Sequence, residues 1–117
     1  MSLEMGEHIP PEHEWMVLRN LHAHNCRGLI LSWGALNQSG HFHVNNHGQT
    51  YLVTKLEGLG YRVSRPRTDL FRNNRPPPPR RYMHPAYGVA QLTSVTVFER
   101  ITPLVACLRQ PPVCAPM

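Results

Sequence analysis

Four consecutive prolines, Pro76 to Pro79, lie between arginines and divide this chain of 117 residues. Proline fixes its own backbone angle and donates no amide hydrogen bond, so residues 65–92 are expected to form an exposed Arg/Pro-rich insertion in the polyproline II conformation. The tail, residues 102–117, carries further prolines and is expected to be disordered. Residues 1–64 and 93–101 remain, and we expect them to form one small domain.

Those remaining residues alternate between helical and strand patterns. Apolar residues recur at helical spacing in two segments, which predicts helices over residues 11–24 and 49–59. Three shorter apolar or β-branched segments predict strands over residues 29–33, 61–64 and 94–100. The alternation predicts an α/β sheet with flanking helices, and the long connection before the last strand is compatible with an antiparallel pair at one edge.

Charge and cysteine usage restrict the cellular setting. The formal net charge is +5, and the arginines concentrate between Arg62 and Arg81, which indicates one basic segment. No apolar run approaches the roughly 20 residues that span a bilayer, and no signal-peptide pattern precedes the first apolar stretch. The three cysteines, Cys26, Cys107 and Cys114, have an odd count and no CxxC spacing, which favours reduced thiols. We therefore expect an intracellular, cytoplasmic protein without a membrane span.

An acidic and histidine-containing cluster lies close to the start of the sequence. Glu4, Glu7 and His8 are spaced so that a single helical turn would place them on one face. Carboxylate oxygens suit magnesium and manganese, and an imidazole widens the choice toward zinc or iron, so this face would suit a divalent cation. A purely structural role explains the spacing equally well, because glutamates in a first helical turn are stabilised by the helix dipole. Both interpretations stay open on spacing alone.

The order of elements, together with the segments SLEMGEHIP (2–10) and GLILSW (28–33), resembles the C-terminal half of class I S-adenosylmethionine-dependent methyltransferases. The resemblance implies a partial Rossmann-like sheet, truncated at its N-terminal side, in which the acidic cluster follows the fourth strand. It also implies that residues 29–33 form the fifth strand, and that residues 61–64 and 95–100 form the sixth and the antiparallel seventh.

Within that resemblance, the cluster is similar to the ExxEH element of small-RNA 2′-O-methyltransferases and ubiquinone-biosynthesis O-methyltransferases. In those families the element supplies metal ligands near the acceptor hydroxyl, and in the former group the loop after the fifth strand adds a histidine. The resemblance therefore implies a divalent metal site drawn from Glu4, Glu7, His8, His41 and His43. The alternative is that the two loop histidines are solvated and form hydrogen bonds with neighbouring backbone groups.

The chain departs from the family where the methyl donor binds. The glycine-rich loop after the first strand and the acidic residue after the second strand, which hold S-adenosylmethionine, have no counterpart here. We therefore expect a methyltransferase-like fragment that neither binds S-adenosylmethionine tightly nor turns over by itself. The fourth strand would be a stub, and the exposed apolar edge of the sheet would be open to a partner chain or a missing segment.

The Arg/Pro-rich segment supports a function of another class. Pro76, Pro79 and Arg81 satisfy the PxxPxR pattern that SH3-type domains bind. Arginines of this region could instead neutralise the phosphates of a nucleic acid, but only Phe71 and Tyr82 interleave them with aromatic rings, which favours a solvated linker over a nucleic-acid interface. The arginines concerned are Arg62, Arg65, Arg67, Arg72, Arg75, Arg80 and Arg81.

Overall fold

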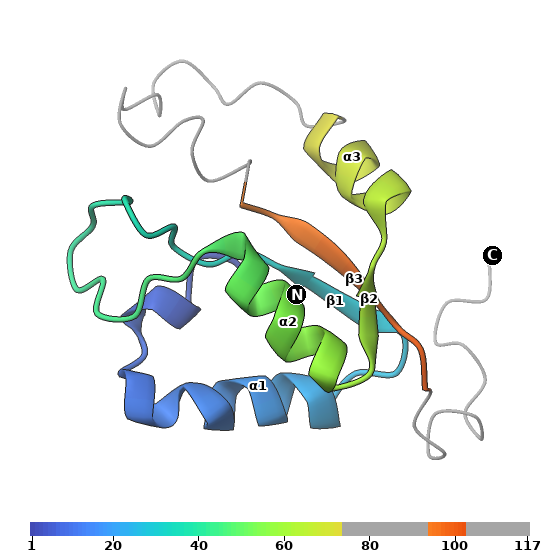
Figure 1. The fold of residues 1–117 in the computed structure, drawn as a ribbon, viewed down its shortest axis with the longest axis horizontal. Helices are drawn as coiled ribbons and strands as arrows, with labels where there is room; N and C mark the ends of the chain where they lie inside the picture. Colours follow the sequence, from blue (N-terminus) through green and yellow to red (C-terminus); the bar gives the residue numbers. More distant parts are fainter. Residues whose placement is uncertain (74–93, 103–117) are drawn as a thin grey trace, which may run out of the picture.

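The structure is a computed structural model, and it describes residues 1–73 and 94–102. This part of the chain is a small α/β domain, as the sequence predicts (Figure 1). Its elements are the 3₁₀ turns η1 (Gly6–His8) and η2 (Pro11–His13), the α-helices α1 (Glu14–Ala23), α2 (Gln49–Gly58) and α3 (Arg65–Asn73), and the strands β1 (Gly28–Leu31), β2 (Tyr61–Val63) and β3 (Thr96–Arg100).

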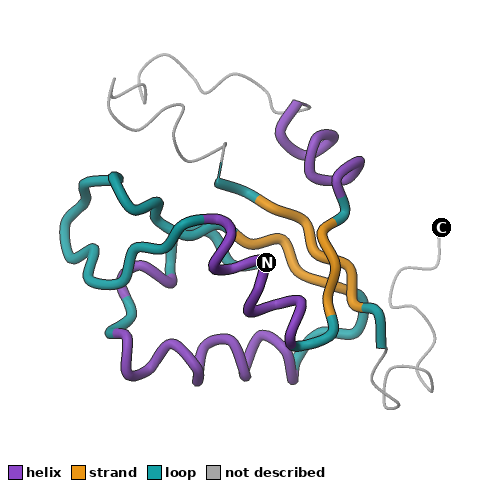
Figure 2. The backbone as a smooth tube through the Cα atoms, in the orientation of Figure 1, coloured by secondary structure: helices purple, strands orange, loops and turns teal. Residues whose placement is uncertain are grey.

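The three strands form one sheet in the order β1-β3-β2, and β3 is antiparallel to both neighbours. Leu29 of β1 and Val63 of β2 both lie opposite Phe98 of β3, which fixes the register. Because both outer strands oppose β3, β1 and β2 run in the same direction. They are joined through a long loop and α2 (Figure 2). A tight turn cannot connect two strands that run in the same direction, so such a crossover is required.

The N-terminal segment extends this sheet at the outer edge of β1. Ser2 forms a parallel bridge with Leu31. The amide of Ser2 donates to the carbonyl of Ile30 at 2.9 Å, and the amide of Ser32 donates to the carbonyl of Ser2 at 3.1 Å. The chain before η1 therefore runs briefly alongside β1 in the same direction.

One face of the sheet carries the apolar core. Helices α1 and α2 pack against this face through leucines that recur at helical spacing, as predicted (Figure 1). Leu56 is fully buried and the Tyr61 ring is 1 % exposed, so the contact between α2 and the sheet excludes water. The buried residues of the core are Leu18, Leu29, Leu31, Trp33, Leu52, Leu56, Tyr61 and Phe98.

Residues 65–73 form helix α3, so the prediction of an exposed polyproline insertion is wrong for this part. Pro66 lies in the first turn, where its missing amide hydrogen costs nothing. The buried Thr68 hydroxyl accepts a hydrogen bond from the amide of Val97 at 3.0 Å, which ties α3 to β3. The remainder of the predicted insertion, from residue 74 on, and the tail beyond residue 102 lie outside the described residues.

The second face of the sheet is only partly covered. Between α3 and β1 lies an apolar groove of about 560 Å³, lined among others by Leu70, Ile30 and Val97. Within the described ranges, no helix is both long enough and apolar enough to cross a membrane. Cys26 is disulfide-bonded, so the prediction of a reduced thiol is wrong for this residue and the cysteines no longer support the predicted compartment.

Candidate functional site

The site begins where the N-terminal segment meets the end of β1. Turn η1 packs directly on the buried indole of Trp33: a Cβ atom at Gly6 would lie 2.2 Å from the ring carbon Cε3. Any larger residue would push η1 away from the sheet. The loop between β1 and α2, residues 32–48, then folds over η1, because the amides of Val44 and Asn45 both donate to the carbonyl of Glu7, at 2.8 and 3.0 Å.

This folding brings Glu7, His8 and His43 together. Their potential ligand atoms all lie within 4.8 Å of one another, and the two imidazole rings meet edge to face at a centroid distance of 4.8 Å. The Glu7 side chain is fully buried, and in the part of the chain that the structure describes neither of its carboxylate oxygens has a hydrogen-bond partner. Nδ1 of the half-buried His43 is also buried without a partner. Three strong polar groups therefore converge without satisfying one another.

The hydrogen bonding of His8 selects the ring nitrogen that is open to a ligand. Its Nδ1 lies 3.2 Å from the carbonyl oxygen of Phe42, and a carbonyl only accepts, so a neutral His8 carries its proton on Nδ1. The lone pair is then on Nε2, the arrangement that backbone carbonyls impose on many metal-bound histidines. Phe42 adopts a φ of 60°, a left-handed conformation that costs free energy for a bulky residue.

Two of the predicted ligands lie elsewhere. Glu4 has a φ of 48° and precedes η1, so the expected single helical turn from Glu4 to His8 does not form. Its carboxylate instead accepts hydrogen bonds from Gln38 Nε2 at 2.9 Å and from Ser94 Oγ at 3.2 Å. His41 is exposed and is not part of the cluster. Of the predicted set, the structure groups only Glu7, His8 and His43.

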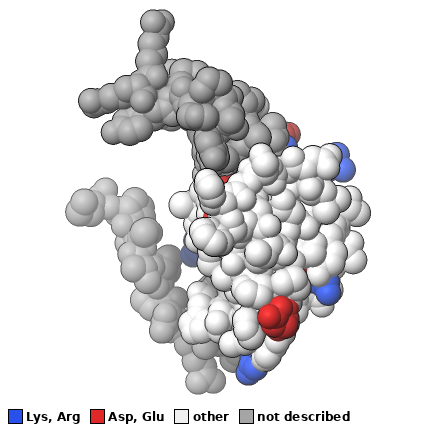
Figure 3. All heavy atoms as spheres, turned by 90° about the vertical axis from the view of Figure 1, so that its left-hand side faces the viewer, with Lys and Arg blue, Asp and Glu red and all other residues white. Residues whose placement is uncertain are grey.

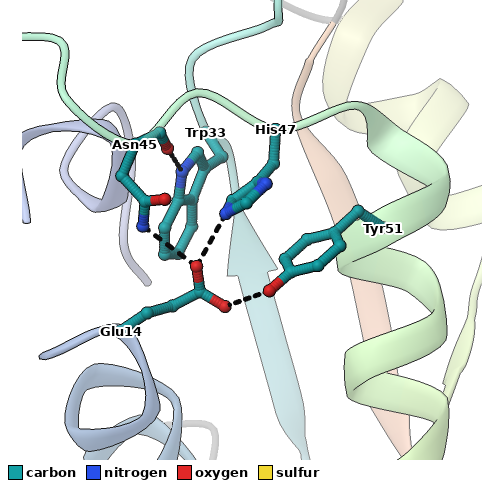
Figure 4. Close-up of polar contacts among 5 residues, drawn as sticks. All are labelled: Glu14, Trp33, Asn45, His47 and Tyr51. Atoms are coloured by element: carbon teal, nitrogen blue, oxygen red, sulfur yellow. Dashed lines mark hydrogen bonds and ion pairs between the residues drawn. The ribbon is translucent and has the colours of Figure 1, made fainter. Parts of the chain in front are cut away.

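A second buried glutamate holds the same loop from below (Figure 4). Oε2 of Glu14, at the start of α1, accepts from Asn45 Nδ2 at 2.9 Å and from His47 Nε2 at 2.7 Å. Its Oε1 accepts from the Tyr51 hydroxyl of α2 at 2.7 Å. The indole of Trp33 donates to the carbonyl of Asn45 at 2.6 Å, so the network is anchored at both ends. Sequence reasoning missed Glu14, although its spacing to Leu18 and Leu21 already placed it on the buried face of α1.

The Glu14 network is stable in its ionised form. Burial by itself would raise the pKa of Glu14, but hydrogen bonds from Tyr51, Asn45 and His47 outweigh that effect and lower the pKa below its ordinary value of 4.5. The hydrogen bond to Glu14, with a smaller contribution from burial, raises the pKa of Tyr51 to about 12. The His47 ring also stacks on Tyr51 at a centroid distance of 3.8 Å. Glu14 is therefore a charged structural anchor for the loop.

Seen from the side of this loop, most of the surface that the structure describes consists of residues other than Lys, Arg, Asp and Glu (Figure 3). The charged side chains in this view lie mainly toward the periphery. Within the cluster itself, Glu7 supplies the carboxylate and His8 and His43 supply imidazoles.

No family model, curated protein or solved structure matches this chain. The ligand atoms of the cluster themselves indicate which ions it could bind. One carboxylate and two neutral imidazoles form a ligand set suited to zinc, manganese, iron or cobalt in the divalent state. The unpartnered oxygens of Glu7 and the buried Nδ1 of His43 fit such an ion, because each lacks another partner within the described residues.

Proposed function

We propose that this chain is the acceptor-side part of an S-adenosylmethionine-dependent methyltransferase-like sheet, inactive by itself, and that Glu7, His8 and His43 bind a divalent metal there. The observation that carries the proposal is the buried Glu7 carboxylate, which has no hydrogen-bond partner among the described residues and lies beside two histidines. Two of these residues occupy the ExxEH positions, and the third lies in the loop where the resemblance expects a histidine.

An ionised carboxylate that is buried without a partner is unfavourable by several kcal/mol unless another group compensates it. Glu7 is held in this position by its backbone, since its carbonyl accepts the amides of Val44 and Asn45 while its side chain is left unsatisfied. A structural glutamate at such a position would be expected to recruit donors, as Glu14 does. A cation supplies the missing compensation for Glu7.

The directions of the strands support the wider proposal. The resemblance assigns β1 and β2 to the fifth and sixth strands, which run in one direction, and β3 to the antiparallel seventh, and the observed directions agree. The parallel bridge between Ser2 and Leu31 agrees with a fourth-strand stub. We assign no residue of this chain to the methyl donor, and propose that a partner chain or a further segment beside β1 supplies that part.

In such a site, a bound divalent metal would lower the pKa of the acceptor hydroxyl and hold it in place. The residues of this chain prepare the site. Phe42 fixes the proton of His8 on Nδ1, Glu7 provides negative charge, and the loop closes over the carboxylate and excludes water from it. These contributions are positioning and electrostatic stabilisation, which act before any methyl transfer.

Titration of the purified chain with manganese, cobalt or zinc by calorimetry tests the metal site. We expect binding of one ion per chain, and we expect His43→Ala to weaken it at least about tenfold, because a ligand is lost. The matched control is His13→Ala, which removes an exposed histidine outside the cluster. Equal affinities for wild type and His43→Ala would refute the site.

Titration with S-adenosylmethionine tests the other half of the proposal. We expect no tight binding to this chain, because no glycine-rich donor loop is present in its sequence. Micromolar binding of S-adenosylmethionine would show that the chain itself holds the methyl donor.

The alternative function, binding of an SH3-type partner through Pro76, Pro79 and Arg81, falls on residues outside the described part and stays a prediction. Nucleic-acid binding also stays a prediction, since Arg75, Arg80 and Arg81 of its seven arginines lie outside the described residues. A pull-down with SH3 domains that is unchanged by Arg81→Ala would count against the SH3 alternative.

A further inference from the structure

A second cleft lies between α2 and α3, next to the end of β2. Its volume is about 540 Å³. Thr68 of α3 and Thr96 of β3 belong to its lining and are only 5 % and 3 % exposed, so their hydroxyls lie deep in the cleft. The charged side chains of the lining are Arg62, Arg65, Arg72, Glu57 and Asp69.

Arg72 is the informative residue of this lining. Its Nε donates to the carbonyl of Val95 at 2.9 Å, which fixes the orientation of the guanidinium group. Its Nη2 is buried and has no hydrogen-bond partner among residues 1–73 and 94–102. A buried charged donor without an acceptor is costly, and an oriented guanidinium presents two parallel N–H groups to a carboxylate or phosphate. A bound anion with several oxygens, such as a carboxylate or a phosphate, would therefore satisfy this guanidinium group.

The charges around the cleft favour an anion. Arg62 and Arg65 are exposed at the cleft, and Arg62 uses Nε and Nη2 to bind Glu99. Glu57 and Asp69 also line the cleft and are exposed, so water screens their charges as it screens those of Arg62 and Arg65, whereas Nη2 of Arg72 is buried. The first turn of α3, which begins at Arg65, adds the positive end of a nine-residue helix. Guanidinium groups, hydroxyls and a helix N-terminus together suit the phosphate group.

The cleft lies at the same edge of the sheet as the Glu7–His8–His43 cluster. Strands β1 and β2 run in the same direction, and the loop with His43 follows β1 while α3 follows β2. The carboxyl ends of parallel strands are the usual ligand-binding edge of α/β sheets. The two sites share no lining residue.

We propose that this cleft binds the phosphate group of a small phosphorylated ligand through Arg72, Arg65 and the hydroxyl of Thr68, which accepts from the amide of Val97 and keeps its own proton to donate. That the ligand is also the methyl acceptor rests on the function proposed above. Phosphate binding itself does not, because it uses none of the metal-site residues. The expected ligand class is a phosphate monoester.

The test is titration of the metal-free full-length chain, in the presence of EDTA, with ribose 5-phosphate, inorganic phosphate and acetate at constant ionic strength. We expect ribose 5-phosphate to bind more tightly than inorganic phosphate, and acetate to bind least. Arg72→Met and Arg65→Met should each weaken binding of ribose 5-phosphate at least about tenfold, the effect of losing one charged hydrogen bond. Arg19→Met, which removes an exposed arginine of α1, is the matched control and should leave the affinity unchanged.

Three results would overturn the proposal. Equal affinities for ribose 5-phosphate and acetate would show that charge alone is responsible. Unchanged affinity in Arg65→Met would exclude the cleft even if Arg72→Met does not fold, since Arg65 is exposed. Tighter binding of a single-stranded RNA oligonucleotide than of ribose 5-phosphate would assign the arginines to nucleic acid instead. Because the titration contains no metal, a failure of the metal site leaves its outcome unaffected.

Discussion

Glu7 and Glu14 are both buried carboxylates, and both contact the loop between β1 and α2, but their surroundings are opposite. Glu14 accepts hydrogen bonds on both oxygens, from Asn45, His47 and Tyr51. Glu7 accepts none on its side chain and faces two histidines. The chain thus shows how it satisfies a carboxylate that is needed for structure. The unsatisfied carboxylate beside it is better explained by a ligand than by packing.

Removal of the charge should destabilise the protein at Glu14 and stabilise it at Glu7. Replacement of the Glu14 carboxylate should be the most damaging change, because it leaves the buried Asn45 and the half-buried His47 and Tyr51 without their charged acceptor. We expect Glu14→Gln to lower the free energy of unfolding by about 2–4 kcal/mol in urea denaturation. Glu12→Gln, at an exposed glutamate of η2, should change it by less than about 0.5 kcal/mol. A loss at Glu14 as small as the loss at Glu12 would remove the contrast.

The pH dependence of stability tests the structural member of this pair, Glu14 with its hydrogen bond from Tyr51. The folded-state pKa of Tyr51 is raised from 10.0 to about 12, so its hydrogen bond stabilises the fold fully below pH 10 and is lost as the pH rises toward 12. Glu14 has a lowered pKa, so its contribution is present above pH 4.5 and is lost in more acidic solution.

We therefore expect wild type to be more stable than Tyr51→Phe at pH 8, and the difference to shrink as the pH approaches 12. Denaturant midpoints measured across this range check the expectation. Parallel curves for the two proteins would mean that Tyr51 does not donate to Glu14.

A smaller effect on stability is expected for changes at the Glu7–His8–His43 cluster. A Cβ atom at Gly40 would lie 2.2 Å from Nε2 of His43, so Gly40→Ala must displace that imidazole. Because the displaced group is the mobile end of a partly exposed side chain, we expect a change in stability of less than about 0.5 kcal/mol. Metal affinity should nevertheless fall about tenfold, as for residues that orient a ligand. Gly58→Ala, where a Cβ meets open space, is the control.

The sequence predicted the regular elements well because their signals are local. Periodicity predicted a helix over residues 49–59, and α2 spans Gln49–Gly58. The strand over residues 61–64 is β2, Tyr61–Val63. Helix α3 was missed because arginine and proline dominate its composition, and its only buried residue is the small polar Thr68. Contacts with β3, which are distant in sequence, stabilise that helix.

The site was predicted only in part for a related reason. The spacing of Glu4, Glu7 and His8 indicated two of these residues, and His43 was expected, together with His41, only from the resemblance to the methyltransferases. Glu4 fits the same spacing, but the chain turns at Glu4 with a positive φ and then forms a 3₁₀ turn instead of an α-helical one. That turn depends on packing of Gly6 against Trp33, a contact that no spacing rule contains.

The most direct test of the central claim is Glu7→Gln, measured for both metal affinity and metal-free stability. The amide keeps the size of the side chain and removes the unpaired charge, so we predict an increase in the free energy of unfolding of about 1 kcal/mol without metal. We predict that the same variant loses metal binding at least about tenfold. A destabilised Glu7→Gln with unchanged metal affinity would show that Glu7 serves the fold, as Glu14 does, and would contradict the account.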